Sequence, residues 1–205
     1  FYQGHWCYVG LEAEVPNPGD FKRTVVGERS VILSRAADGT LHCFENVCAH
    51  RGMQFCRARH GNRKEFVCPY HQWSYTLSGD LQGVPLRRGV RQDGQVKGGM
   101  PADFNPKEHG LTKLKVATRG GVVFASFDHD VEPLEDYLGP TITEYFDRLF
   151  NGRALTILGY NRQRIPGNWK LMQENIKDPY HPGLLHTWFV PFGLWRADNK
   201  AALKM

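Results

Sequence analysis

The stretches CAHRG at residues 48–52 and CPYHQW at residues 68–73 decide how this chain is interpreted. The spacing is C-x-H, then seventeen residues, then C-x2-H. Each stretch follows a predicted strand, so both are expected in loops that leave a sheet. Thiolate and imidazole groups are common ligands of zinc and iron, so the pattern predicts a metal centre. Its candidate ligands are Cys48, His50, Cys68 and His71.

Two kinds of metal centre use two cysteines and two histidines. A structural zinc ion takes all four ligands tetrahedrally, and its common patterns pair Cys with Cys and His with His. A Rieske [2Fe–2S] centre places two cysteines on one iron and two histidines on the other. Because each loop here supplies one ligand of each kind, each loop can reach both irons. The spacing therefore favours the cluster over zinc and over four unrelated core residues.

A second constellation lies in ENIKDPYHPGLLH at residues 174–186. Its H-x4-H pair, His181 and His186, is a weak signal alone. Non-haem iron that activates dioxygen uses two histidines and one carboxylate. Asp178 lies three residues before His181, at a distance suited to a carboxylate that orients a ligand imidazole. Asn175 lies one turn earlier on the predicted helix.

These two motifs, in this order, resemble the large (α) subunits of Rieske non-haem iron aromatic-ring-hydroxylating oxygenases, and the resemblance covers essentially the whole chain. It implies an α+β fold: a β-rich Rieske domain, then the beginning of a catalytic domain with an antiparallel, helix-grip-like sheet. It also implies a cluster on the four candidate ligands and a mononuclear Fe(II) on His181 and His186. By position, Asp178 would contact His181 and, across a subunit interface, His71.

The expected activity follows from the same resemblance. The wording MPADFNPKEHGL at residues 100–111 and that of the H-x4-H segment are most similar to enzymes acting on aromatic carboxylates: salicylate, anthranilate and terephthalate. We expect hydroxylation of salicylate or a close analogue with O2 and with electrons from NAD(P)H. The implied partners are a ferredoxin, an NAD(P)H-dependent reductase and copies of the chain in an α3 or α3β3 assembly with a small β subunit.

One feature departs from the family pattern. The family's third iron ligand, an aspartate or glutamate, comes far downstream of the second histidine. This chain ends nineteen residues after His186, and the acid in that tail, Asp198, does not match the position. We therefore expect a piece cut at both ends, with the third ligand outside it. The alternatives are an electron-transfer protein that uses only the first constellation and a zinc-stabilised binding module.

The pattern of elements predicts two domains. Eight short candidate strands precede residue 128; two helices over 132–150, a strand over 154–165 and a helix over 168–178 follow it. Asn168 is the predicted N-cap of the last helix, which should end at Asp178 before Pro179. The predicted domains are 1–128, carrying the cluster, and 129–205, the start of the catalytic domain.

Composition limits partners and compartment. The chain has 205 residues, 41% of them hydrophobic, which suits one or two folded domains. Five cysteines without a secretory signal indicate a reducing, cytoplasmic compartment. No apolar run is long enough to span a membrane. The net charge is +5, with its densest block at residues 57–66. We interpret that block as a solvated loop, with docking of an acidic protein as the alternative and nucleic-acid binding disfavoured.

Overall fold

The computed structural model describes residues 2–178, 180–189 and 191–192. It divides into two compact units, Phe1–Leu158 and Gly159–Met205, which are described separately. The first unit is built on strands and the second on short helices.

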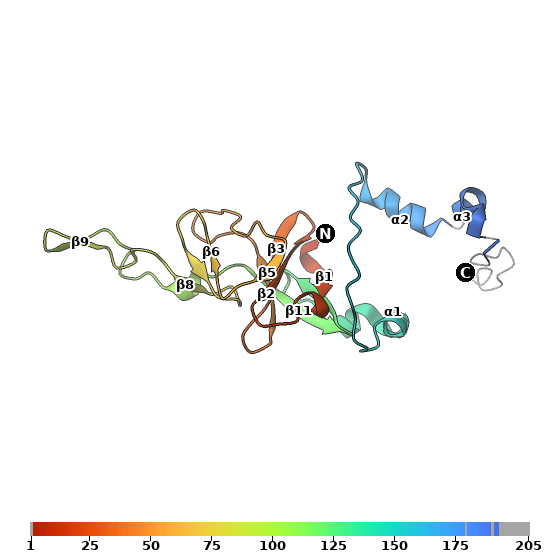
Figure 1. The fold of residues 1–205 in the computed structure, drawn as a ribbon, viewed down its shortest axis with the longest axis horizontal. Helices are drawn as coiled ribbons and strands as arrows, with labels where there is room; N and C mark the ends of the chain where they lie inside the picture. Colours follow the sequence, from red (N-terminus) through yellow and green to blue (C-terminus); the bar gives the residue numbers. More distant parts are fainter. Residues whose placement is uncertain (1, 179, 190, 193–205) are drawn as a thin grey trace. The chain divides into compact units, whose positions relative to one another are not determined.

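A seven-stranded antiparallel sheet forms the centre of the first unit (Figure 1), in the order β1-β12-β11-β4-β3-β2-β5. Its strands are β1 (Cys7–Leu11), β2 (Asp20–Val26), β3 (Arg29–Arg35), β4 (Leu41–Glu45), β5 (His60–Asn62), β11 (Lys113–Arg119) and β12 (Val122–Ser126). A three-stranded sheet contains β6 (Phe66–Val67), β7 (Ser74–Tyr75) and β8 (Leu81–Gly83). A separate hairpin joins β9 (Val90–Gln92) to β10 (Gln95–Lys97).

The eight strands predicted before residue 128 are confirmed, each to within a few residues. β3 is rich in β-branched and apolar residues and buries its middle four positions, which suits a strand with neighbours on both sides. The basic block at residues 57–66 is not entirely loop, because His60–Asn62 forms β5. This short strand pairs with β2, where Gly61 lies opposite Phe21 at the sheet edge.

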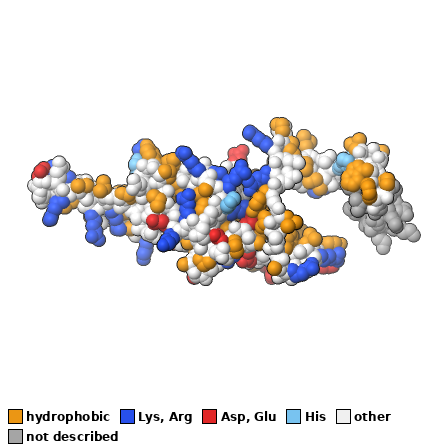
Figure 2. Space-filling model, in the orientation of Figure 1, with side chains coloured by type: hydrophobic (Ala, Val, Ile, Leu, Met, Phe, Trp, Pro, Cys, Tyr) orange, Lys and Arg blue, Asp and Glu red, His pale blue; other side chains and the backbone are white. Residues whose placement is uncertain are grey.

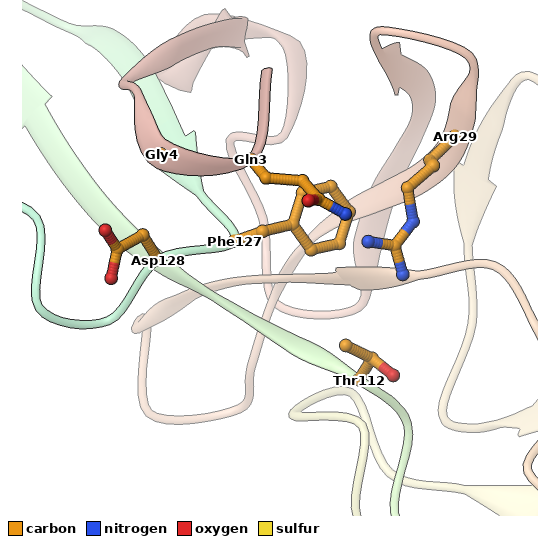
Figure 3. A pocket seen from close by; sticks show the side chains of 6 residues that line it. All are labelled: Gln3, Gly4, Arg29, Thr112, Phe127 and Asp128. Atoms are coloured by element: carbon orange, nitrogen blue, oxygen red, sulfur yellow. The ribbon is translucent and has the colours of Figure 1, made fainter. Parts of the chain in front are cut away.

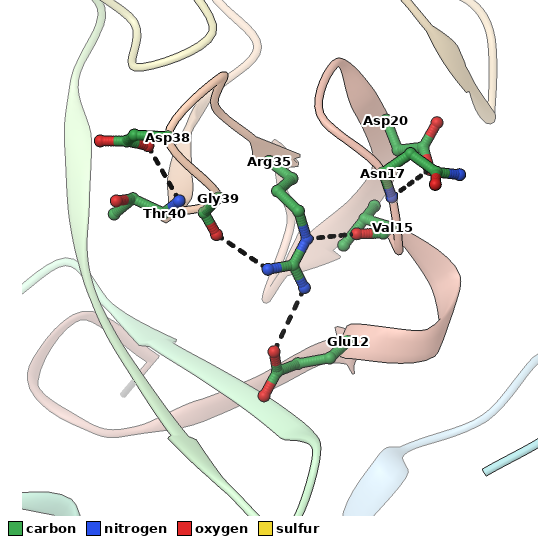
Figure 4. Close-up of polar contacts among 8 residues, drawn as sticks. All are labelled: Glu12, Val15, Asn17, Asp20, Arg35, Asp38, Gly39 and Thr40. Carbon is green, nitrogen blue, oxygen red and sulfur yellow. Dashed lines mark hydrogen bonds and ion pairs between the residues drawn. The ribbon is translucent and has the colours of Figure 1, made fainter. Parts of the chain in front are cut away.

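Arg35 fastens several turns at the end of β3 (Figure 4). Its guanidinium donates to the Val15 carbonyl at 2.6 Å and to the Gly39 carbonyl at 2.8 Å. It also pairs with the Glu12 carboxylate at 3.2 Å. One planar donor thus satisfies two backbone oxygens that the turns leave without ladder partners.

The two predicted helices over 132–150 form one bent element, α1 (Leu134–Leu149). The bend lies at Gly139, whose φ of 68° is a conformation that glycine adopts without strain. Pro140 follows it and has no N–H to continue the helical hydrogen bonds. Leu134 packs with the buried Trp6, and Arg119 of β11 holds the helix through Asp147 at 2.7 Å. The first unit therefore continues past the sheet, and the division at residue 128 stays a prediction.

Three 3-10 turns complete the first unit: η1 (Tyr2–Gly4), η2 (Glu12–Glu14) and η3 (Pro106–Glu108). The last lies in the long excursion between β8 and β11, which also carries the β9–β10 hairpin.

The second unit contains α2 (Trp169–Lys177), α3 (Tyr180–Leu185) and η4 (Thr187–Phe189). The Asn168 side chain accepts from the Lys170 N–H at 3.0 Å, so the predicted N-cap is confirmed, and α2 ends before Asp178 as expected. The strand predicted over 154–165 is wrong: these residues join no sheet, and a strand requires a hydrogen-bonded neighbour. No helix within the described ranges is long and apolar enough to cross a membrane.

Candidate metal centres

Each of the two Cys-His loops contains a backbone turn of the same kind. The Cys48 N–H donates to the Met53 carbonyl at 2.8 Å, and the Gly52 N–H returns to the Cys48 carbonyl at 2.9 Å. The second loop has the same two hydrogen bonds at Cys68. Gly52 and its counterpart Gln72 both have positive φ, 71° and 58°. The matching bonds are Cys68 N–H to Trp73 O at 2.9 Å and Gln72 N–H to Cys68 O at 2.8 Å.

This shared turn brings ligands of the same kind together across the loops. The rings of His50 and His71 lie 4.6 Å apart, centroid to centroid. The side chains of Cys48 and Cys68 are buried, and Cys48 lies close enough to contribute to the raised pKa of Cys68. No three His, Cys, Asp or Glu side chains converge on one ion anywhere in the described residues. Two cysteines on one side and two histidines on the other suit a binuclear cluster, whereas one tetrahedral zinc requires four convergent ligands.

Burial shifts the pKa of two of the four candidate ligands, Cys68 and His50. Burial raises the pKa of Cys68, an effect opposed by the N–H groups of Tyr70 and His71, which donate to its sulfur. Burial lowers the pKa of His50, and His71 and Arg51 add to this by repulsion. The Nδ1 atom of His50 is buried, and among the described residues it has no hydrogen-bond partner. A neutral imidazole with a free nitrogen is the form that binds a metal.

Two buried polar residues support the first loop and were not predicted. The Tyr75 hydroxyl lies 3.1 Å from Cys48 Sγ and accepts from the Ala49 N–H at 3.0 Å. Asn46 accepts from the Cys56 N–H at 2.9 Å and donates to the Cys56 carbonyl at 2.8 Å. Both side chains are fully buried. An asparagine next to a ligand loop was a usable signal in the sequence, because a buried amide requires hydrogen-bond partners.

Aromatic rings enclose the histidine side. Trp73 stacks on His50, with centroids 4.7 Å apart and planes 10° from parallel. Tyr70 lies over His71 at 3.8 Å, although 56% of its surface is exposed. Trp73 is therefore packed against the candidate ligands, whereas Tyr70 covers His71 from a largely exposed position.

The second constellation occupies α3 and its C-terminal end. His181 lies inside a separate short helix, α3, beyond the end of α2. His186 follows that helix, and its N–H donates to the Pro182 carbonyl at 3.1 Å. The two imidazole rings lie 5.3 Å apart. Two adjacent rings on one short helical segment can share a metal ion.

Asp178 caps α3, its Oδ1 accepting from the Tyr180 N–H at 2.8 Å. The Nδ1 atom of His181 is buried and, within the described ranges, lacks a hydrogen-bond partner. The expected Asp178–His181 contact thus stays a prediction, as does the one across a subunit interface. Asn175 lies exposed on α2. Asp198 lies outside the described residues.

A shallow pocket of about 400 Å3 is lined by Gln3, Gly4, Arg29, Thr112, Phe127 and Asp128 (Figure 3). Arg29 lines it, with its guanidinium 3.9 Å from the centre of the Phe127 ring. One edge of that guanidinium, Nε and Nη2, already donates to the two carboxylate oxygens of Glu45. The pocket holds no cysteine or histidine, so it adds nothing to the metal chemistry.

Comparison with known proteins assigns the first unit. A family model described as the Rieske [2Fe-2S] domain matches residues 5–94, which contain both Cys-His loops. The salicylate 5-hydroxylase large oxygenase component of a Ralstonia species is 78% identical over all 205 residues. Residues 5–94 are a Rieske [2Fe-2S] domain, and the whole chain is similar to the large component of an oxygenase.

Further relatives agree with this similarity. The anthranilate 1,2-dioxygenase large subunit of Burkholderia cepacia is 50% identical over 96% of this chain. Naphthalene 1,2-dioxygenase from a Rhodococcus species, solved with indole bound, matches with a TM-score of 0.81 and 32% identity. That match covers 99% of this chain and 45% of the other. The chain spans about half the length of the curated relatives, covering 48% of the Ralstonia protein and 45% of the Burkholderia one.

Proposed function

We propose that this chain is part of a Rieske oxygenase large subunit that hydroxylates an aromatic carboxylate, salicylate or a close analogue. The observation that carries the proposal is that ligands of the same kind lie side by side across the two loops, His50 next to His71 and Cys48 next to Cys68. The chain that holds them is 78% identical to a salicylate 5-hydroxylase component. In this proposal Cys48, Cys68, His50 and His71 hold the [2Fe–2S] cluster. The domains are 1–128 for the cluster and 129–205 for the start of the catalytic domain.

A mononuclear iron site at His181 and His186 completes the proposal. Bound there, Fe(II) supplies the reaction with dioxygen, while the protein supplies position and a dry pocket. Asp178 acts as the positioning carboxylate, holding the His181 ring and linking it to His71 of a neighbouring subunit. The free Nδ1 of His181 supports this, because ligand imidazoles commonly donate their second nitrogen to a carboxylate. Asn175 supports Asp178 from the preceding turn.

The proposed system is multicomponent and cytoplasmic. A reductase takes electrons from NAD(P)H, a ferredoxin carries them, and the large subunits form an α3 or α3β3 ring. A small aromatic acid and O2 are the substrates, with no nucleic acid or membrane involved. The exposed apolar side chains of α2, such as Trp169 and Ile176, support a larger catalytic domain, whose sheet would cover them.

Asp178→Asn in the full-length polypeptide tests the proposed role of Asp178 as the link between the cluster ligand His71 and the iron ligand His181. An asparagine oxygen keeps the cap on the Tyr180 N–H, so α3 is preserved. We expect both metals to remain bound while oxidation of the cluster no longer yields hydroxylated product. A single-turnover experiment follows both signals, and unimpaired product formation would reject the role of Asp178.

The second candidate is an electron carrier without oxygenase activity. It is favoured by the match of the family model to residues 5–94 alone. Oxygen uptake by the full-length polypeptide with salicylate and a reductase system separates the two, because a carrier consumes no oxygen in response to the aromatic acid.

A further inference from the structure

A continuous series of aromatic contacts leads from His50 to the protein surface. His50 stacks on Trp73, which is 4% exposed. The edge of Trp73 meets Phe104 at 6.0 Å and His109 at 6.2 Å, centroid to centroid. Phe104 and His109 stack on each other at 4.6 Å, with planes 8° apart. Four rings therefore join one proposed cluster ligand to the loop at residues 101–110.

Positive charge surrounds the outer end of this series. The Arg87 guanidinium lies 5.5 Å from the centre of the Phe104 ring and donates to the Phe104 carbonyl at 3.3 Å. Arg87 begins an arm, residues 87–99, that includes β9 and β10 and carries basic side chains along its length (Figure 2). The arm holds four basic residues and one acid: Arg87, Arg88, Arg91, Lys97 and Asp93. Beyond it, Asp103, Lys107 and Glu108 carry a net charge of −1, so the arm and this loop together carry +2.

The arm has the character of a docking element. All six residues of β9 and β10 are exposed, and in the described structure the hairpin pairs with no other strand. An isolated two-stranded hairpin is marginally stable in water. Its exposed Val90 and Val96, among basic side chains, suit a protein surface that is acidic with an apolar centre.

We infer that the arm base and the Phe104–His109 stack form the docking surface for an acidic protein electron donor, and that the electron enters through Trp73 to His50. This rests on the proposed function, because it requires a bound cluster. The donor's reduced centre loses one electron and one ferric ion of the cluster becomes ferrous, with no bond made or broken. The charge steers the acidic donor to this face, and the packed rings provide a compact route inward.

The test measures the rate of cluster reduction in the holoprotein by stopped-flow absorbance. The donor is reduced plant-type [2Fe–2S] ferredoxin, an acidic protein, and dithionite is the small-molecule comparison. The variants are Arg87→Glu for charge, Phe104→Leu for the aromatic route, and Lys64→Glu for the competing basic block at residues 57–66. Arg148→Glu on α1 is the matched surface control.

We expect Arg87→Glu to slow reduction by ferredoxin about tenfold or more at low salt, and to flatten its salt dependence. Phe104→Leu should lower the limiting rate at saturating ferredoxin. In both variants the dithionite rate and the reduction potential should match the wild type, as should all properties of Arg148→Glu.

Three results would overturn the inference: wild-type ferredoxin rates in both variants, slowing by Lys64→Glu alone, or equal slowing with dithionite, which would indicate a structural defect. A wild-type holoprotein without a reducible cluster would refute the proposed function itself.

Discussion

Tyr75→Phe removes one oxygen from the centre of the proposed cluster site. The Tyr75 hydroxyl accepts from the Ala49 N–H, so its own hydrogen is directed to Cys48 Sγ, 3.1 Å away. A sulfur bound to iron carries no proton and accepts that hydrogen bond. Reduction adds negative charge to the cluster and its sulfurs, so the bond is stronger in the reduced state than in the oxidised state.

The size of the effect follows from ordinary hydrogen-bond energies. A difference of about 1 kcal/mol between the two states corresponds to about 40 mV for a one-electron couple. Tyr75→Phe should therefore lower the reduction potential by about 40 mV. The variant also removes the acceptor of the Ala49 N–H; because Ala49 is exposed and its N–H can bond water instead, the loss of unfolding free energy should be about 0.5–1.5 kcal/mol.

Protein-film voltammetry measures the potential, and urea denaturation measures the unfolding free energy. Tyr70→Phe is the matched control, because it deletes a hydroxyl from an exposed tyrosine beside the same cluster and keeps the ring over His71. A Tyr75→Phe protein that loses stability but keeps the wild-type potential would refute donation to a cluster-bound sulfur.

Two further substitutions test the surroundings of the site. Asn46→Ala removes the partner of both backbone groups of Cys56 and should lower the unfolding free energy, measured in urea, by about 2–4 kcal/mol. Gln54→Ala, at an exposed position, is the control and should change the unfolding free energy by no more than about 0.5 kcal/mol. Equal effects of the two substitutions would contradict a stabilising role for the Asn46–Cys56 hydrogen bonds. Burial and then Lys113 lower the pKa of His42, against the opposing effects of Asp38 and Asp80, so the folded state binds this proton less tightly than the unfolded state. The stability that His42 contributes is therefore complete above its ordinary pKa of 6.5 and is lost as the pH falls toward the lower pKa of the folded state. His42→Gln should reduce the difference between the unfolding free energies at about pH 7.5 and about pH 5.5. Identical pH slopes in the two proteins would show that His42 contributes nothing.

The strands of the first unit were predictable because apolar alternation and turn residues are local signals. β3 and β12 show this, since their burial follows directly from their side chains. The strand expected over 154–165 failed because local propensity does not supply a pairing neighbour. α3 was missed because Pro182 and Gly183 indicate a loop. Proline is tolerated in the first turn of a helix, where its missing N–H has no intrahelical acceptor.

The ligands of the proposed cluster were predictable from spacing, but their support was not. Tyr75 lies 27 residues from Cys48 in the chain, and its contact depends on how β7 packs beneath the first loop. The stack of Phe104 on His109 likewise depends on the fold of a long excursion that carries no periodic pattern. Such contacts between distant segments are set by tertiary packing, which one sequence does not display.

The most direct test of the account is metal and sulfide analysis of the purified protein together with its visible spectrum and electron paramagnetic resonance. We predict a coloured protein with iron and acid-labile sulfide in equal amounts within residues 1–158, a resonance signal that appears on reduction, and loss of all three in Cys68→Ser. A colourless wild-type protein with one zinc ion at these four side chains would contradict it.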